Sequence, residues 1–293
     1  MSKDKWNCPV VVCAYNRPDY LDQCLNAVVA FPEVQGGDVP VYVFCDGGPM
    51  ATPNENAIII AKYPQVTKIF WQTDNLCIAK HIHYIRQTIF DDLNYERMVF
   101  FEDDIVPSVY YYRYMNRALD IFSRRDDTVG VVNSCSVCLL SLVEKQMKHT
   151  LFSDSLSHLN NYVMLKRTWV TIKPTLQEYI DTFLPSGQSY RDINHDGVLE
   201  WASQKILNAK NILPQVRIDI TSKHRTSSQD SITNVAMRIN NLRYLSSFVN
   251  RILNIGKTGF HYRIGDYERH GLDKMTLDVF PEDSRKVIEV REW

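Results

Sequence analysis

The chain has 293 residues, of which 33 are Lys or Arg and 34 are Asp or Glu, so its formal net charge is −1. This balance excludes the strongly basic surface that general nucleic-acid binding needs, and any anion site must therefore be local. No apolar run reaches the length that spans a bilayer, and residues 1–7 lack the apolar core of a signal peptide. The seven cysteines favour reduced thiols over a disulfide framework. We therefore expect a soluble cytoplasmic protein without a membrane span or a nucleic-acid partner.

Strand and helix patterns alternate through the first half of the chain. The run VVVCA at 10–14 is apolar and rich in β-branched residues, which is typical of a strand covered on both faces. In chain order the pattern predicts a strand at 10–14, a helix after the break at 16–19, a strand at 41–45, a helix at 54–62, a strand at 66–71, a helix at 78–90, a strand ending at 102, a helix at 109–122 and a strand at 129–133. Such alternation predicts an α/β fold with a mostly parallel, Rossmann-like sheet flanked by helices.

The alternation is looser after residue 134. The pattern predicts a strand at 162–165, a short helix at 166–171 and an amphipathic helix at 197–208. The last part of the chain is more polar and irregular. No internal repeat, low-complexity tract or linker indicates a second domain. We therefore expect a single domain with a regular half, 1–134, and a less regular half, 135–293.

Three consecutive acids, Glu102, Asp103 and Asp104, follow the predicted fourth strand. They stand where an apolar strand ends, which is the edge at which open α/β sheets bind ligands. Three like charges repel one another unless a cation neutralises them, and a divalent metal that carries a diphosphate would do so. The alternative is an acidic turn that caps the next helix, with Pro107 near its first turn. These three acids are called the acidic tip below.

Polar residues also follow the first two predicted strands. Arg17 comes after the first strand and Asp46 after the second, so both are expected at the same crevice as the acidic tip. Arg17 suits a phosphate or an acid as partner, and Asp46 can accept hydrogen bonds from a base or a ribose. Each residue also has an ordinary interpretation, Arg17 in a salt bridge and Asp46 in a turn before Gly47. Because Arg17, Asp46 and the acidic tip are all expected at one edge of the sheet, we favour the interpretation that they form a binding site.

Two segments in the second half have alternative interpretations. Asp196 precedes the helix predicted at 197–208. In this position it could be the N-cap of the helix, or it could project from the helix start into a cleft and serve as a general base. The spacing does not decide between these roles. The polar and basic segment 223–228 is either a solvated loop or a lid that closes over an anionic donor.

Three other motifs do not support a competing function. Gly256-Lys257-Thr258 lacks the glycine that a phosphate loop needs five positions earlier, where the chain has Arg251. No Gly-x-Gly-x-x-Gly dinucleotide fingerprint follows the first strand. The pair Cys135 and Cys138 has no second pair at zinc-finger spacing, so we interpret both as buried thiols.

In order along the chain, the segments VVVCAYNRP, FCDGG, IAKH and FFEDDIVPS resemble those of the GT-A fold glycosyltransferases. The resemblance is to N-acetylglucosaminyltransferase I and the protein O-mannose N-acetylglucosaminyltransferases in particular. It covers roughly 8–114 and, more faintly, 162–230. The acids followed by Ile-x-Pro-Ser are the more specific motif, whereas the other segments are individually weak. The family also implies that 1–134 bind the nucleotide sugar and that 135–293 bind the acceptor.

The resemblance implies a role for each matching position. Asp104 would be the direct ligand of Mn²⁺ or Mg²⁺, and Asp196 aligns with the catalytic base. The donor contacts would involve Asp46 at the uracil, Asp103 at the ribose and Glu102 at the sugar, with Ala14, Arg17 and His81 near the nucleotide. We also expect Arg225, in the basic segment, to clamp the diphosphate. Around Asp196 the chain has Asn-His-Asp-Gly where the family has tryptophans and a second acid, so Asp192 and Glu200 stay open as alternative bases. The family's membrane anchor and stem have no counterpart here, which favours a bacterial or viral enzyme.

These observations predict an inverting glycosyltransferase that moves a sugar from a UDP-sugar to a hydroxyl of an oligosaccharide or glycoprotein acceptor. The resemblance implies GlcNAc as the donor sugar, while xylose, glucose and galactose fit the chemistry equally well. The alternatives are a module that binds nucleotide sugars without catalysis and a retaining GT-A transferase.

Overall fold

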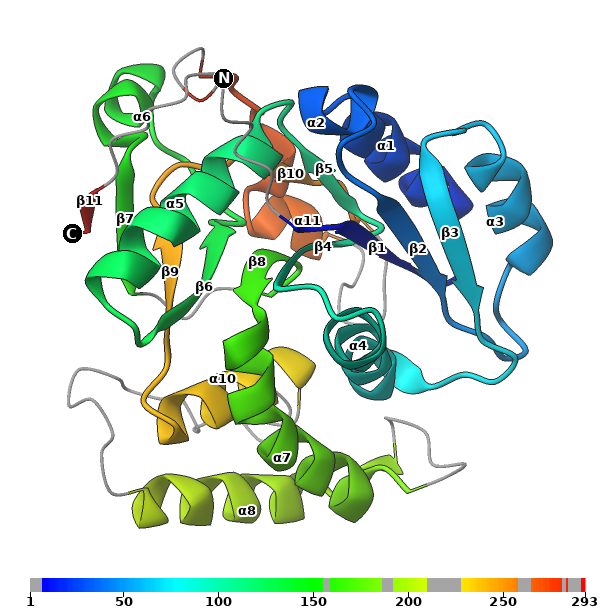
Figure 1. Cartoon of the computed structure of the whole chain (residues 1–293), viewed down its shortest axis with the longest axis vertical. Helices are drawn as coiled ribbons and strands as arrows, with labels where there is room; N and C mark the ends of the chain where they lie inside the picture. The colour runs from blue at the N-terminus through cyan, green and yellow to red at the C-terminus, as the bar shows by residue number, and fades with distance from the viewer. Residues whose placement is uncertain are drawn as a thin grey trace.

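A mixed sheet forms the centre of the molecule. The computed structural model describes residues 7–154, 159–185, 192–209, 228–257, 265–280, 283 and 291–292. Within this part of the chain nine strands make one sheet in the order β11-β7-β9-β6-β8-β4-β1-β2-β3 (Figure 1). These strands are β1 (Val10–Ala14), β2 (Val41–Cys45), β3 (Val66–Trp71), β4 (Arg97–Glu102), β6 (Val129–Ser134), β7 (Leu151–Asp154), β8 (Asn161–Leu165), β9 (Arg243–Ser247) and β11 (Arg291–Glu292).

Helices cover both faces of this sheet, which confirms the predicted fold class of a mostly parallel α/β sheet. The α-helices of the described residues are α1 (Pro18–Val29), α2 (Pro32–Gln35), α3 (Pro53–Ile60), α4 (Cys77–Gln87), α5 (Tyr111–Arg125), α6 (Leu142–Lys148), α7 (Lys166–Phe183), α8 (His195–Asn208), α10 (Gln229–Ile239) and α11 (Asp266–Arg269). The chain continues α4 as a π-helical segment, Thr88–Asp92, and forms a 3-10 turn at Leu272–Lys274.

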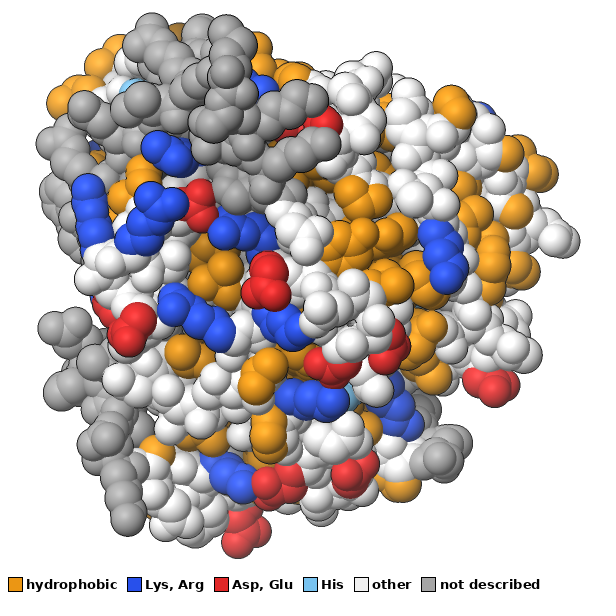
Figure 2. All heavy atoms as spheres, viewed as in Figure 1, with side chains coloured by type: hydrophobic (Ala, Val, Ile, Leu, Met, Phe, Trp, Pro, Cys, Tyr) orange, Lys and Arg blue, Asp and Glu red, His pale blue; other side chains and the backbone are white. Residues whose placement is uncertain are grey.

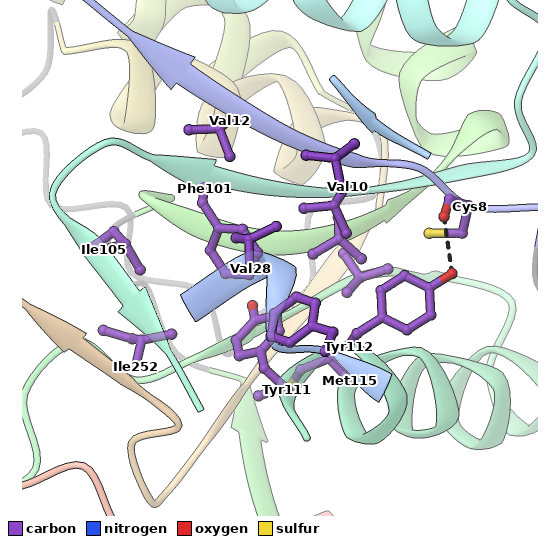
Figure 3. Close-up of a cluster of buried hydrophobic side chains, with 14 of the residues drawn as sticks. Cys8, Val10, Val12, Val28, Phe101, Ile105, Tyr111, Tyr112, Met115 and Ile252 are labelled. Atoms are coloured by element: carbon purple, nitrogen blue, oxygen red, sulfur yellow. Dashed lines mark hydrogen bonds between the residues drawn. The ribbon is translucent and has the colours of Figure 1, made fainter. Parts of the chain in front are cut away.

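Strand β1 shows why both faces need helices. All five of its residues are buried, and successive side chains of a strand point to opposite faces. Val10 and Val12 pack in the core cluster that holds residues of α1 and α5, as Figure 3 shows. Val11 and Cys13 pack in the opposite cluster, with residues of α4, α7 and α10. The uninterrupted apolar run is therefore the signature of a strand between two helical layers.

The predicted elements of the first half are present within one or two residues, except that α4 ends three residues early and α5 ends three residues late. Strand β1 pairs in parallel with both β2 and β4, and β2 pairs in parallel with β3. The carboxyl ends of β1, β2 and β4 therefore lie at one edge of the sheet. Strand β8 is antiparallel to both β4 and β6 and joins the two halves of the sheet.

The second half is more regular than the sequence predicted. The helix expected at 166–171 is α7, which continues to Phe183 although it contains Pro174. Trp169, Ile172, Leu176 and Tyr179 are buried at helical spacing, and this packing outweighs the hydrogen bond that the proline removes. The expectation of irregular structure near the C-terminus is wrong for α10 and β9, because β9 pairs with β6 and β7 inside the central sheet.

A second, two-stranded sheet positions a late segment beside the acidic tip. Strand β5 (Ile105–Pro107) follows the acids directly and pairs antiparallel with β10 (Ile252–Asn254). Asn254 is the register partner of Ile105. The residues that follow β10 are thereby brought to Asp104, which precedes β5.

The surface agrees with the balanced composition. On the face shown in Figure 2, Lys and Arg side chains lie among Asp and Glu side chains. Among the described residues, no helix has both the length and the apolar character that a membrane crossing requires.

Candidate active site

The ends of three adjacent strands bring most of the predicted site residues together. Strand β1 lies between β2 and β4, with Cys13 in register with Glu102 and Ala14 in register with Cys45. The Asp46 N–H donates a hydrogen bond of 2.9 Å to the Ala14 carbonyl oxygen. Ala14, Asp46 and the acidic tip therefore share one edge of the sheet, as their positions after the strands predicted.

Arg17 holds the acidic tip together. It occupies the N-cap position of α1, directly before Pro18 at the first helical position. Its guanidinium forms an ion pair with Asp103 through Nη2 and donates a hydrogen bond of 2.8 Å from Nη1 to Asp104 Oδ2. The guanidinium also lies 5.3 Å from the centre of the Tyr20 ring. One cation thus bridges two adjacent carboxylates.

The acidic tip carries more negative charge than Arg17 neutralises. Burial raises the pKa of Asp103 to about 6 despite the opposing effect of Arg17. Burial also raises the pKa of Glu102 well above its ordinary value, and the charges of Asp104 and Asp230 raise it further. Carboxylates in such surroundings favour any additional cation, because it offsets both desolvation and mutual repulsion.

Asp104 has one oxygen that suits a metal ion. Its Oδ2 pairs with Arg17, whereas its Oδ1 is buried and has no hydrogen-bond partner among the described residues. Among the described residues, no group of three or more His, Cys, Asp and Glu side chains forms a complete metal site. Asp104 Oδ1 could contribute one carboxylate oxygen to a hard divalent cation, which prefers oxygen ligands.

The turn after β10 encloses Asp104, and sequence reasoning missed it. The Ile255 N–H donates a hydrogen bond of 2.9 Å to the Asp104 carbonyl oxygen, and the Lys257 N–H donates one of 3.1 Å to Tyr20 Oη. A Cβ atom on Gly256 would lie 2.3 Å from Asp104 Oδ2. Gly256 is therefore required for the close approach of this backbone to the carboxylate. No local pattern predicts this contact, because long-range pairing of β10 with β5 brings Gly256 to Asp104.

Replacing Gly256 with alanine is expected to displace the Asp104 carboxylate. The added Cβ would lie 2.3 Å from Oδ2 and 3.0 Å from Cγ, so the ion pair with Arg17 has to shift. Overpacking of this kind costs about 1–3 kcal/mol. Chemical denaturation should show this loss of stability. Gly37→Asn is the control, because asparagine tolerates a left-handed φ such as the +69° at this position and no atom lies within 4 Å of the added Cβ. Equal stability of Gly256→Ala and wild type would contradict the expectation.

Neighbouring backbone groups hold the Asp46 side chain in place. Its Oδ1 accepts hydrogen bonds of 2.9 Å from the N–H groups of Gly47 and Leu76. Burial raises the pKa of Asp46, although both hydrogen bonds oppose the rise. Gly47 lies so close to the backbone of Gln72 that a Cβ would approach its carbonyl oxygen to 2.4 Å. The carboxylate is thus held at the sheet edge by a tightly packed turn.

His81 lies inside the core on α4. It is 1% exposed, its Nδ1 lies 3.6 Å from Cys13 Sγ, and its Nε2 has no hydrogen-bond partner among the residues that the structure describes. Burial lowers the pKa of His81 to about 4, so the imidazole is neutral near pH 7. His81 therefore packs beside β1 as a neutral side chain.

Acid is expected to destabilise the protein through His81. Its pKa of about 4 in the folded state lies below the ordinary value of 6.5, so the unfolded chain binds more protons between these two pH values. The free energy of unfolding should fall as the pH drops through this window, by up to about 3 kcal/mol from this residue. Urea denaturation of wild type and His81→Gln at pH 7 and pH 4.5 measures the effect. The difference between the two pH values should be smaller in the variant, and equal differences would exclude His81 as the cause.

The predicted base lies on a helix that packs outside α7 and α10. Asp196 is exposed in the first turn of α8, and Asp192 and Glu200 are exposed as well. Asp196 is not the N-cap, because the side chain of Asn194 caps the helix by accepting from the Gly197 N–H at 3.0 Å. Figure 1 shows α8 on the far side of α7 and α10 from the sheet. Arg225 and most of the segment 223–228 lie outside the described residues.

Asp230 is a further carboxylate that sequence reasoning did not consider. It lies in the first turn of α10, whose N-cap is Ser228, and Gln229 Nε2 donates a hydrogen bond to its Oδ1. Its charge contributes to the raised pKa values of Glu102 and Tyr162. Asp230 therefore adds a carboxylate from another segment to the electrostatic environment of the acidic tip. The sequence shows the cap of this helix, but it does not show that the charge of Asp230 acts on Glu102.

No protein-family model matches the chain, and no curated protein matches it in sequence. Similar solved structures include a mannosyltransferase from Pyrobaculum calidifontis in complex with GDP-Man and Mn²⁺, with 11% identity over 81% of this chain and 74% of that chain and a TM-score of 0.46. TarS 1–349 from S. aureus has 14% identity over 75% and 71%, with a TM-score of 0.46. Glucosyl-3-phosphoglycerate synthase from Mycobacterium tuberculosis, in complex with Mn²⁺, UDP and glucosyl-3-phosphoglycerate, has 10% identity over 56% and 58%, with a TM-score of 0.37. Identities this low concern the fold alone, so function has to be inferred from the residues of this chain.

Proposed function

We propose that this protein is an inverting glycosyltransferase that uses a UDP-sugar and a divalent cation. The observation that carries the proposal is the position of the Asp104 carboxylate. It lies at the carboxyl edge of the parallel strands, and one of its oxygens is buried without a hydrogen-bond partner in the part of the chain that the structure describes. This edge is where open α/β sheets bind nucleotides. A nucleoside diphosphate needs charge neutralisation to leave, and a site of this kind suits that need.

The donor is proposed to lie along the ends of β1, β2 and β4. Asp46, fixed by the backbone of Gly47 and Leu76, would accept hydrogen bonds from the uracil. Asp103 would contact the ribose and Glu102 the transferred sugar, while Ala14 would contribute backbone contacts beside Asp46. Arg17 would position the acidic tip near the phosphates. Arg225 is proposed to clamp the diphosphate.

Asp104 Oδ1 would hold Mn²⁺ or Mg²⁺, which when bound supplies positive charge to the diphosphate of the donor. Arg17 would keep Asp104 in place by the hydrogen bond from its Nη1 to Asp104 Oδ2. Asp196 is proposed to take the proton from the acceptor hydroxyl as that oxygen attacks the anomeric carbon. The bond from the anomeric carbon to the diphosphate breaks on the opposite side, so a single displacement inverts the configuration. The acceptor would be an oligosaccharide or a glycoprotein bound by the second half of the chain.

A module that binds nucleotide sugars without catalysis is the second candidate. The observation that favours it is the ion pair between Arg17 and Asp104, which already supplies one positive charge to the acidic tip. Such a module would bind UDP with little dependence on a metal. It would release no UDP from any sugar donor.

A donor screen separates the two candidates. The purified protein is incubated with UDP-GlcNAc, UDP-glucose, UDP-galactose or UDP-xylose, each with Mn²⁺, with Mg²⁺ or with a chelator. We expect slow release of UDP from one donor, dependent on the metal and faster when its acceptor is added. Binding of UDP without release from any donor would favour the module, and neither binding nor release would overturn both.

A further inference from the structure

A small cavity lies between α4, α7 and α10. Its polar lining consists of His83 and Arg86 from α4 and Gln229 and Thr233 from α10, and apolar side chains of all three helices complete the wall. The cavity has a volume of about 20 Å³, which is enough for one water molecule or one ion of similar size. It is therefore too small for a nucleotide or a sugar.

Arg86 brings a buried positive charge to this cavity. Its side chain is fully buried, with 1% of the residue exposed. Its Nε donates a hydrogen bond of 3.1 Å to Tyr162 Oη, and its Nη1 donates one of 3.2 Å to Thr233 Oγ1. Its Nη2 is buried and has no hydrogen-bond partner among the described residues. Within the described part of the chain, Arg86 therefore contacts neutral hydroxyls and forms no ion pair.

The other buried Lys and Arg side chains of the described residues show how this protein compensates such a charge. Each of them forms an ion pair with a carboxylate: Arg238 with Asp154, Arg251 with Asp283 and Lys145 with Asp278. A buried charge without a partner is costly, because the protein interior replaces little of the solvation that water supplies. Arg86 is the exception in this set, and an anion bound beside it would supply the missing negative charge.

Two further residues with unsatisfied polar atoms line the same cavity. His83 is 7% exposed, and both of its ring nitrogens are buried without a hydrogen-bond partner among the described residues. One ring nitrogen carries a proton in either neutral tautomer, so the ring can donate to an anion. Gln229 Oε1 is also buried and lacks a described partner, while Gln229 Nε2 donates to Asp230.

These polar atoms allow two occupants, water and a small anion. Gln229 Oε1 favours water, because a carbonyl oxygen accepts hydrogen bonds and repels an anion. Arg86 Nη2 and the N–H of His83 suit either occupant. The charge decides between them, because a water molecule would satisfy hydrogen bonds but would leave the Arg86 guanidinium without a counter-charge.

We propose that the cavity between α4, α7 and α10 binds a monovalent anion of the size of chloride, held by Arg86 Nη2 and a ring N–H of His83. The anion neutralises the one buried guanidinium of the described chain that forms no ion pair. Because the unfolded chain has no such site, binding stabilises the folded state. The proposal concerns stability and does not depend on the proposed function.

Crystals of the full chain grown in sodium bromide test the identity of the occupant. Bromide carries the charge of chloride and scatters X-rays anomalously, whereas water does not. We expect an anomalous peak in the cavity, within hydrogen-bonding reach of Arg86 Nη2. A water molecule at that position, or bromide at surface positions only, would overturn the proposal.

Urea unfolding in sodium chloride and in sodium gluconate of equal ionic strength tests the effect on stability. Gluconate is too large for the cavity, so it provides the baseline. Binding at one site should raise the equilibrium constant for folding about elevenfold when chloride is present at ten times its dissociation constant. Equal stability in the two salts over the whole concentration range would exclude the anion.

Gln229→Glu should remove this dependence on chloride, because it places a carboxylate of nearly the same size at the cavity wall and so supplies the negative charge itself. Gln177→Glu is the matched control and should keep the full effect. Gln177 also donates to an aspartate, Asp181, at 2.8 Å, but it does not line the cavity. Arg86→Gln should lose the effect as well, and if that variant does not fold, Gln229→Glu decides alone. A Gln229→Glu protein that gains as much stability from chloride as the wild type would overturn the proposal.

Discussion

Asp104→Ala is expected to abolish metal-dependent turnover of the UDP-sugar, with a loss of about a thousandfold or more, as for other groups that stabilise developing charge. The substitution removes the buried Oδ1, which no described residue contacts by a hydrogen bond, and also the oxygen that pairs with Arg17. Arg17 keeps its partner Asp103, so the fold should survive. UDP release measured over a range of Mn²⁺ concentrations reports the effect.

The control for Asp104→Ala is Asp127→Ala. Asp127 is an exposed acid just before β6, at the opposite edge of the sheet, and its loss should leave turnover unchanged. Thermal unfolding of both variants separates a lost metal ligand from a lost fold. A folded Asp104→Ala protein with full activity would exclude Asp104 as the metal ligand.

Asp196→Asn is expected to lower the turnover number by about a hundredfold to ten-thousandfold, which is the usual contribution of a general base. The amide cannot take the proton of the acceptor hydroxyl, but it preserves the size of the side chain. Asp196 is exposed and is not the helix cap, so the variant should fold normally. The affinity for UDP with Mn²⁺ should stay within about twofold of the wild type, a free-energy difference of about 0.4 kcal/mol. Transfer assays and calorimetry measure the two quantities separately.

Three further variants identify the base if Asp196→Asn stays active. Asp192→Asn and Glu200→Gln remove the other acids around the start of α8, and Asp230→Asn removes the carboxylate that influences Glu102. The variant that lacks the general base should lose turnover, and a higher pH should not restore it. Activity rescued by a small external base would support the assignment of that position, whereas near-normal turnover in Asp196→Asn would exclude Asp196.

The regular half of the fold could be predicted because its signals are local. The run at 10–14 is buried on both faces, and an uninterrupted apolar run of that length requires no knowledge of its partners. The start of α1 followed from Pro18, which suits the first turn of a helix. The length of α7 was underestimated, because Pro174 indicates a helix end while buried contacts from Trp169 to Tyr179 decide otherwise.

The candidate site was predictable only in part. Residues that directly follow parallel strands share one edge of the sheet, so Arg17, Asp46 and the acidic tip could be grouped from their positions alone. The ion pairs of Arg17 with Asp103 and Asp104 were one of the open alternatives for that residue. Gly256 and Asp230 could not be found, because each is brought to the acidic tip by an element far from it in the sequence.

The sequence by itself determined which segments are strands and helices and which charged groups follow the strands, because both depend on neighbours within one or two helical turns. Tertiary structure alone decided the surroundings of those charges. It placed β10 against β5 so that a glycine closes over Asp104, and it buried His81 against Cys13 so that its imidazole is neutral. The physical reason is that burial and long-range pairing set desolvation and charge proximity, which no local pattern of residue types encodes.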